Sequence, residues 1–399
     1  MRRLFIVLIL SICGFSIDAA PKLSEKAQIS LLTYSRTNEV HAMYGHTALR
    51  VKDPLNGFDM IFNYGMFDFN SNNFVYRFVK GETDYILGVS NFEYLTIECY
   101  MRNMSVDEQI YNLTAKEKQR IFDFLSTNAE PQNRVYRYNF LYDNCATRPR
   151  IVIENNVDGK VIYKDSIPTK TFRELIHDCT VGSPWLRFGI DLVLGCPLDN
   201  KATYLEQMFL PHYMEDAYNR AVIVDSTGAE RKLVEPSVQI IPSQADTDIS
   251  ENPYTSPNVL FGLLMVVLFA LSFFGFKKGH FYRGIDFTLF LVFGLAGLLI
   301  FFMTFFSTHP TTNPNYILFV LHPVHLAFAT IIFIPYFRSK LAYYHIVNSV
   351  ILAIFLILVR FLPQQFPTAL LFMTFALFFR SFFQTIGFLK INKKKIRFD

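Results

Sequence analysis

Apolar and polar residues are distributed differently in the two parts of this chain. Up to about residue 257, charged, polar and apolar residues are mixed as in a water-soluble domain, whereas long apolar runs broken by short polar loops follow. A helix needs about 20 apolar residues to cross the hydrocarbon core of a bilayer. The pattern therefore predicts a soluble domain followed by an all-α bundle of about five transmembrane helices over residues 258–389.

The loops between the apolar runs predict how the bundle is oriented. The runs cover residues 259–276, 287–306, 316–337, 343–362 and 367–389. Lys and Arg follow the first, third and fifth runs, whereas loops 307–315 and 363–366 contain neither. Because basic loops stay in the cytoplasm, we expect a bacterial inner-membrane protein with residues 390–399 as a basic cytoplasmic tail and the soluble domain in the periplasm.

The N-terminus agrees with this orientation, since it resembles a secretory signal peptide. Arg2 and Arg3 precede an apolar run, and Ala19 and Ala20 offer small residues for cleavage. We expect residues 1–20 to be the signal peptide. Two other interpretations remain, namely an uncleaved signal anchor and a lipoprotein modified at Cys13.

Residues 21–224 are expected to form the periplasmic domain, with a linker over 225–257. Runs at 27–35, 47–52, 60–63, 85–89 and 135–141 are rich in apolar and β-branched residues and predict strands. Thr114 and Glu117 form a capping-box pattern that predicts a helix through residue 125. Because the domain is exported, Cys179 and Cys196 are able to form a disulfide.

Cys145 is the first candidate for chemistry. It lies between a predicted strand and a predicted helix, and a helix N-terminus favours a thiolate and offers N–H groups to an oxyanion. His46, after a glycine turn at the start of a strand, is the best-placed base, ahead of His41, His177 and His212. From the residues alone, a small buried cysteine and a structural histidine remain the commoner interpretation.

Other chemistries have no comparable pattern. The sequence contains no His-Glu-x-x-His or paired Cys-x-x-Cys spacing and no glycine-rich phosphate loop. We therefore expect no metal and no cofactor, and we predict no nucleic-acid partner.

Three segments carry a resemblance to known proteins: residues 45–51 (GHTALRV), 63–69 (NYGMFDF) and 139–148 (NFLYDNCATR). A histidine strand before an Asn-Cys helix resembles the permuted papain-like fold of the NlpC superfamily, which includes lecithin:retinol acyltransferase. The blocks are more specifically similar to those of an Lnb-like Bacteroidota envelope family with an N-terminal periplasmic domain, linked to lipoprotein N-acylation. The similarity continues into residues 306–310 and 313–316.

The resemblance implies an α+β permuted papain-like domain and an N-acyltransferase activity. A phospholipid would donate an acyl chain to Cys145, and the α-amine of a diacylated lipoprotein would accept it. His46 would be the base, and Asn63 would orient the imidazole, with Asp68 and Tyr34 as alternatives. Arg50 and Arg148, which lie in the matching blocks, are expected to bind substrate.

Polar residues near the outer end of the bundle are further candidates for substrate binding. They are His309, His322 and Arg360, and we expect them to meet a lipid head group. In the alternative interpretation, Arg360 extends to the interface and the histidines bond within the bundle. Arg380, on the inner side, is expected to extend to the interface.

Two other functions remain open at this stage. One is a thiol hydrolase of the envelope, acting on peptidoglycan or on phospholipids. The other is a non-catalytic assembly protein on the same scaffold, because a fold alone does not determine function.

Overall fold

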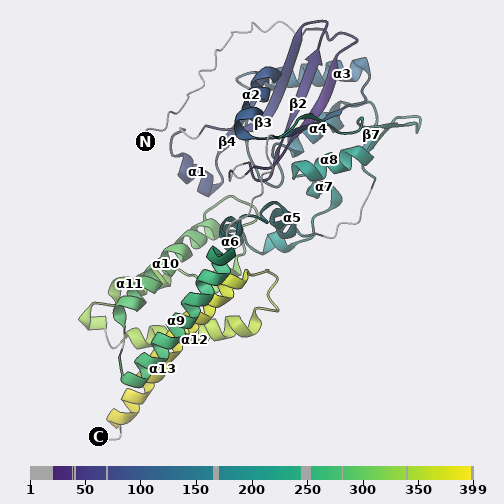
Figure 1. Ribbon diagram of the computed structural model, residues 1–399. Coiled ribbons are helices and arrows are strands. Elements are labelled where there is room, and N and C mark those ends of the chain that lie inside the picture. Colours follow the sequence, from purple (N-terminus) through teal and green to yellow (C-terminus); the bar gives the residue numbers. More distant parts are fainter. Residues whose placement is uncertain are drawn as a thin grey trace.

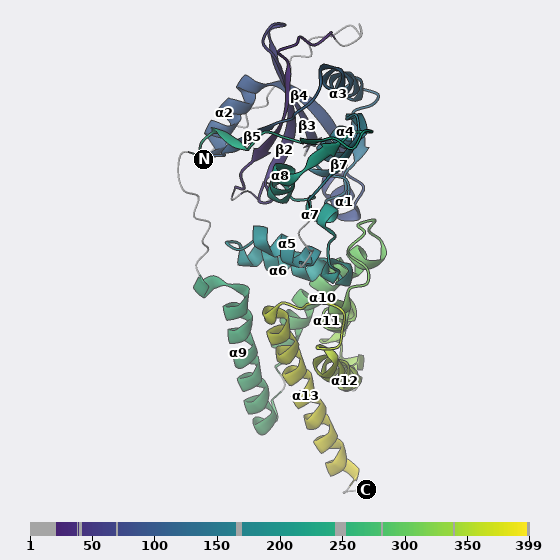
Figure 2. The same ribbon diagram turned by 90° about the vertical axis from the view of Figure 1, so that its right-hand side faces the viewer.

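The computed structural model describes residues 21–396 except 38, 40–41, 69–70, 165–169, 244–252, 281 and 338–339. The predicted signal peptide and Cys13 lie outside the described residues. The chain forms a soluble domain and a helical bundle at opposite ends of an elongated molecule, with a layer of short helices between them (Figures 1 and 2).

A seven-stranded antiparallel sheet organises the soluble domain, in the order β10-β5-β1-β2-β3-β4-β6. Its strands are β1 Gln28–Tyr34, β2 His46–Asp53, β3 Phe58–Met66, β4 Asp84–Asn91, β5 Val106–Ile110, β6 Val135–Arg137 and β10 Val238–Ile241. The five predicted runs correspond to β1–β4 and β6. β5 and β10 were not predicted, because both are short and mix polar with apolar residues.

Helices cover both faces of this sheet. On one face, α3 (Ala115–Asn128) and α4 (Thr147–Asn156) pack on Leu31 and Leu49, and on the other α2 (Phe92–Arg102) packs on Leu32 and Ala48. Alternate residues of a strand point to opposite faces, so strands buried on both sides have continuous apolar runs. The capping box predicted at Thr114 and Glu117 begins α3.

The soluble domain extends further than predicted. Residues 225–257 were expected to be a linker, but they contain β9 (Glu230–Lys232) and β10. β9 completes a second sheet with β7 (Lys160–Ile162) and β8 (Val222–Val224), and β10 pairs with β5. These strands are too short to give a clear alternating pattern.

Short helices form the layer between the sheet and the bundle (Figure 2). They are α5 Phe172–Cys179, α6 Pro184–Val193, η1 Cys196–Asp199 and α7 Tyr204–Gln207, whereas α8 Pro211–Arg220 packs on the sheet through Met214 and Tyr218. Buried Arg173 ties this layer together through ion pairs with Asp191 (2.7 Å) and Asp199 (2.8 Å). The suggested disulfide is absent, since Cys179 and Cys196 are both free.

Four helices in the described part of the chain are long and apolar enough to cross a membrane. They are α9 Pro257–Lys278, α10 Arg283–Phe305, α12 Leu341–Leu358 and α13 Thr368–Ile396, with η2 (Pro253–Thr255) leading into α9. They correspond to the first, second, fourth and fifth predicted runs.

The third predicted run is broken into three pieces. They are η3 Tyr316–Phe319, α11 Val324–Ile331 and η4 Pro335–Phe337. Pro323 and Pro335 lie at the breaks, and proline interrupts a helix because it lacks a backbone N–H. The broken segment lies very close to α10, where a Cβ atom on Gly294 would be 2.4 Å from the Leu326 nitrogen and one on Gly297 would be 2.6 Å from the His322 nitrogen.

The close packing at Gly297 predicts that a larger side chain there lowers the free energy of unfolding, whereas one at Gly284 on the same helix does not. Gly297→Leu should force the broken segment away from α10 and destabilise the protein by about 1–3 kcal/mol, as overpacking does elsewhere. Gly284→Leu is the matched control, because nothing lies within 4 Å of a Cβ at that position. Thermal unfolding in detergent should show a lower Tm for Gly297→Leu only, and equal Tm values would contradict the close packing.

Candidate active site

His46 is positioned by a glycine turn at the end of the connection between β1 and β2. It is the first residue of β2 and pairs with Tyr34 on β1. Gly45 before it has φ +75°, and a Cβ there would lie 2.9 Å from the Tyr34 carbonyl oxygen. Only glycine fits this turn without strain.

Cys145 is held just before α4 by the side chain of Asn144. The Asn144 Oδ1 accepts hydrogen bonds from the amides of Ala146 and Thr147, both at 2.9 Å, and its Nδ2 donates to the carbonyls of Phe140 and Phe209. Asn144 therefore caps the helix and anchors the loop at once, which gives a physical reason for the Asn-Cys pair. Because it takes these two amides, they are not free to bind an oxyanion as the sequence suggested.

Thr47 joins β2 to this loop. Its hydroxyl donates a buried hydrogen bond of 2.5 Å to the carbonyl oxygen of Cys145. Since Thr47 follows His46 directly, this bond brings together two segments that lie 98 residues apart.

The predicted trio of Cys145, His46 and Asn63 lies together. The Nε2 of His46 lies 2.5 Å from the Oδ1 of Asn63 on β3, so Nε2–H donates and Nδ1 is left to exchange a proton with the thiol. Tyr34, an alternative orienting residue, instead packs its ring edge-on against the imidazole at 5.3 Å. Cys145 is 7% exposed, so the sulfur is nearly enclosed.

Cys145 and His46 each shift the pKa of the other. Burial alone would raise the pKa of Cys145, but the charge and hydrogen bond of His46 outweigh it and lower the pKa. Burial alone would lower the pKa of His46, but Cys145 and the hydrogen bond to Asn63 raise it. Both shifts favour a thiolate–imidazolium pair, the form in which cysteine is nucleophilic.

Two neighbours of Cys145 were missed by sequence reasoning. The Tyr138 ring lies beside Cys145, since a Cβ on Gly65 would be 3.8 Å from the Tyr138 Cε2 and 3.5 Å from the Cys145 Cβ, and burial is the main reason that the pKa of Tyr138 is raised. Gly65 has φ +96°, and a Cβ there would lie 3.5 Å from the Cys145 Cβ and 3.6 Å from the His46 Cε1. Gly65 thus leaves room beside the pair. Both residues adjoin or belong to the blocks of the resemblance, which was the available signal.

Two arginines predicted to bind substrate are engaged in structural contacts. Arg50 is 6% exposed, pairs with Asp59 (2.5 Å) and Glu108 (3.1 Å), and stacks on Phe92. Arg148 forms two hydrogen bonds to Asp143, at 2.6 and 2.7 Å, and stacks 3.6 Å above Tyr136. These contacts give each guanidinium a role in the fold.

His309 lies where the bundle meets the soluble domain. Its ring donates to the carbonyl of Phe78 at 2.9 Å, at the end of α1 (Phe74–Lys80). Beside it, the amide of Thr308 donates to Lys80 at 2.8 Å. Gly81 leaves room for this contact, since a Cβ there would lie 2.7 Å from the Thr308 hydroxyl.

Asn315 forms a second junction, with α6. Its Nδ2 donates to the carbonyls of Leu192 (2.9 Å) and Val193 (3.3 Å), and its Oδ1 accepts from Gln364. The amides of Gly195 and Cys196 add hydrogen bonds of 2.7 and 2.9 Å to the same loop. Loop 307–315 is therefore bonded to the soluble domain at two places.

His322 and Arg360 lie apart from this junction. His322 is in the bundle, stacked on His325 with ring centroids 3.8 Å apart. Arg360 follows α12 and has an exposed side chain. In the described part of the chain, neither forms a hydrogen bond with a residue around Cys145.

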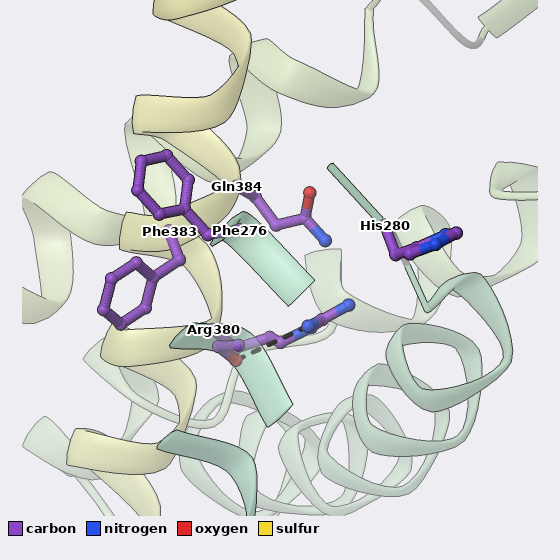
Figure 3. Close-up of a pocket in the computed structure, with 6 residues that line it drawn as sticks. Phe276, His280, Arg380, Phe383 and Gln384 are labelled. Atoms are coloured by element: carbon purple, nitrogen blue, oxygen red, sulfur yellow. Dashed lines mark hydrogen bonds between the residues drawn. The ribbon is translucent and has the colours of Figure 1, made fainter. Parts of the chain in front are cut away.

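Arg380 does not extend to the interface as predicted. It is 2% exposed and forms a bidentate ion pair with Asp286 on α10, with Nη2 to Oδ2 at 3.0 Å. A small cavity beside this pair is lined by Ser272, Phe276, His280, Arg380, Phe383 and Gln384 (Figure 3). Sequence reasoning missed the pair because Asp286 lies just before the apolar run. The cavity lies beside the C-terminal part of α9, the end of that helix farther from the soluble domain (Figure 1).

No group of three or more potential metal ligands occurs among the described residues. The side chains gathered around Cys145 offer a thiol, an imidazole, an amide and a phenol.

Comparisons with known proteins match the two parts of the chain separately. A family model described as the Lnb N-terminal periplasmic domain matches residues 23–178, and one described as the Lnb transmembrane domain matches residues 249–393. No curated protein and no solved structure matches the chain.

The altered pKa values predict selective reactivity of one thiol. Cys145 should react with iodoacetamide below the pH at which an ordinary thiol does, whereas burial raises the pKa of Cys179 to about 11 and that of Cys99 to about 12. His46→Ala should move the reaction of Cys145 to higher pH, because it removes the charge that stabilises the thiolate. Mass spectrometry of alkylated peptides across a pH series measures this, and an unchanged profile in His46→Ala would argue against the pair.

Proposed function

The chain belongs to the Lnb family, whose domains indicate a function in lipoprotein N-acylation in the cell envelope, and we propose that it is the acyltransferase itself. In this proposal a phospholipid is the acyl donor. The acceptor is the α-amine of a lipoprotein's diacylglyceryl-cysteine. The observation that carries the proposal is the Cys145–His46 pair, oriented by Asn63, in a domain bonded directly to a transmembrane bundle.

The first half of the reaction forms a thioester. The Cys145 thiolate attacks the ester carbonyl of the phospholipid, and the negative charge moves to the carbonyl oxygen. We assign the hydrogen bond to that oxygen to the Tyr138 hydroxyl, because the Tyr138 ring lies beside Cys145 at Gly65. When the intermediate collapses, the C–O bond breaks and the lysophospholipid alkoxide takes the proton of the His46 imidazolium.

The second half transfers the chain to the amine. The neutral α-amine attacks the thioester carbonyl, and His46 takes a proton from the nitrogen. The C–S bond then breaks, so that an amide forms and the thiolate and imidazolium return to their starting state. No other reactant is required.

The arrangement of the site also supports the expected fold and topology. A histidine strand that precedes a cysteine helix in the chain fits a permuted papain-like domain. We place this domain in the periplasm, with the bundle in the inner membrane and the basic C-terminal tail in the cytoplasm. Both lipid substrates would then reach Cys145 from the outer leaflet.

Substitutions should separate the roles of Cys145, His46 and Tyr138. Cys145→Ala and His46→Ala should reduce transfer by about 10²–10⁴-fold or more, because they remove the nucleophile or the base. Tyr138→Phe should reduce it about 10²-fold, which is typical for loss of one oxyanion donor. The readout is mass spectrometry of lipoprotein N-termini and of acyl-Cys145 in the full-length protein.

Matched controls keep this test specific. Cys179→Ala removes a buried thiol outside the site and should leave transfer unchanged. Near wild-type transfer by Cys145→Ala would refute thioester catalysis. Release of free fatty acid with no acylated lipoprotein would identify a hydrolase instead.

A further inference from the structure

Helix α1 presents apolar side chains to its surroundings. It has seven residues and no buried ones, and Val75, Tyr76 and Phe78 are 73%, 56% and 51% exposed. Three large apolar side chains exposed on two turns are costly in water, because each leaves a large apolar area hydrated. A short helix of this kind needs an apolar environment on its outer side.

The position of α1 identifies that environment. In both views α1 lies on the side of the soluble domain that faces the bundle (Figures 1 and 2). Its last turn is bonded to Thr308 and His309, and the Tyr76 ring lies 6.3 Å from that of Phe302 on α10. At the same end of α10, Phe305 and Phe306 are each 58% exposed. The apolar surface of α1 therefore continues the lipid-facing surface of a membrane helix.

A row of aromatic rings leads from α1 towards Cys145. Phe78 packs on Phe74 at 5.9 Å and Phe74 on Phe67 at 5.7 Å. Phe67 then packs on Tyr85 at 4.9 Å, and Tyr85 on Tyr138 at 4.1 Å. Tyr138 and Cys145 both border Gly65, where a Cβ would lie 3.8 Å from the Tyr138 Cε2 and 3.5 Å from the Cys145 Cβ. These five rings, which we call the aromatic row, connect an exposed helix to the nucleophile without a charged side chain among them.

We propose that α1 lies in the outer leaflet and that the aromatic row guides the acyl ester of the phospholipid donor from the leaflet to Cys145. The inference rests on the proposed function for the direction of transfer, while the contact of α1 with lipid stands on its own. An acyl chain gains about 0.8 kcal/mol per buried methylene against apolar surface, so it would follow rings in preference to water. The ester carbonyl would then arrive beside the sulfur, where Gly65 leaves room.

Helix α2 also exposes apolar residues, but its position gives no reason to place it in the membrane. Tyr94, Ile97 and Met101 on α2 are 61%, 52% and 73% exposed, comparable to those of α1. However, α2 lies farther from the bundle than α1 in both views (Figures 1 and 2). It therefore provides a control with similar loss of apolar surface.

Cross-linking tests the lipid contact independently of catalysis. The full-length Cys145→Ala protein is reconstituted in vesicles of phosphatidylethanolamine that carries a diazirine in one acyl chain. After irradiation, lipid adducts should map to residues 74–80 and to the outer end of α10, and not to α2. Absence of adducts on α1, with adducts on α10, would overturn the inference.

A donor comparison tests the path to Cys145. In Val75→Ser/Tyr76→Ser/Phe78→Ser, acylation of Cys145 from vesicle phospholipid should slow about tenfold or more, while acylation by water-soluble p-nitrophenyl butyrate should be unchanged. The α2 variant Tyr94→Ser/Ile97→Ser/Met101→Ser should match the wild type with both donors.

The outcomes separate the two proposals. Wild-type rates with vesicle donor in the α1 variant, or equal slowing with both donors, would overturn the role of α1. If the wild-type protein acylates Cys145 from neither donor, the proposed function fails, and the cross-linking result still decides whether α1 contacts lipid.

Discussion

The hydrogen bond from the Thr47 hydroxyl to the Cys145 carbonyl is the contact on which the active-site geometry depends. It joins a strand to the loop before α4. Thr47 directly follows His46, and its partner is Cys145 itself, so the bond fixes both residues of the proposed catalytic pair. Since it is buried, losing the hydroxyl would leave a carbonyl without a partner, which costs about 1–3 kcal/mol. Asn144 anchors the same loop through the Phe209 carbonyl and the Ala146 amide, so hydrogen bonds to more than one segment fix the backbone around Cys145.

A second constraint is imposed by the boundary between water and membrane. Backbone groups need hydrogen-bond partners wherever water is excluded, and a loop at the membrane surface cannot rely on water alone. Loop 307–315 obtains these partners from the soluble domain, at α1 through Thr308 and at α6 through Gly195 and Asn315. Trp185 on α6 adds a hydrogen bond to the Thr255 carbonyl at the entrance to α9. The bundle therefore holds the catalytic domain at a defined height and orientation.

Sequence reasoning succeeded where local pattern decides the outcome. The capping box at Thr114, the strands around His46 and Asn63, and four apolar helices depend on neighbouring residues, and all are present in the structure. It failed where partners come from distant segments. The Arg380–Asp286 pair joins two helices, and β10 is a strand only because β5 lies beside it. Tyr138 was likewise missed, because it lies beside Cys145 only once β6, which ends at Arg137, has paired with β4.

The fixed position of Cys145 relative to the transmembrane bundle gives a physical reason for an apolar surface between the membrane and Cys145. The junctions at α1 and α6 fix the domain relative to the bundle, so in the proposed reaction the donor ester would have to rise from the head-group level to the sulfur. A row of rings lowers the cost of that step by replacing contacts with lipid by contacts with aromatic surface. In the proposed reaction it would also limit water near the thioester, which would give an amine held in the same leaflet an advantage over hydrolysis. The apolar surface that admits the first proposed substrate would thus protect the intermediate until the second one arrives.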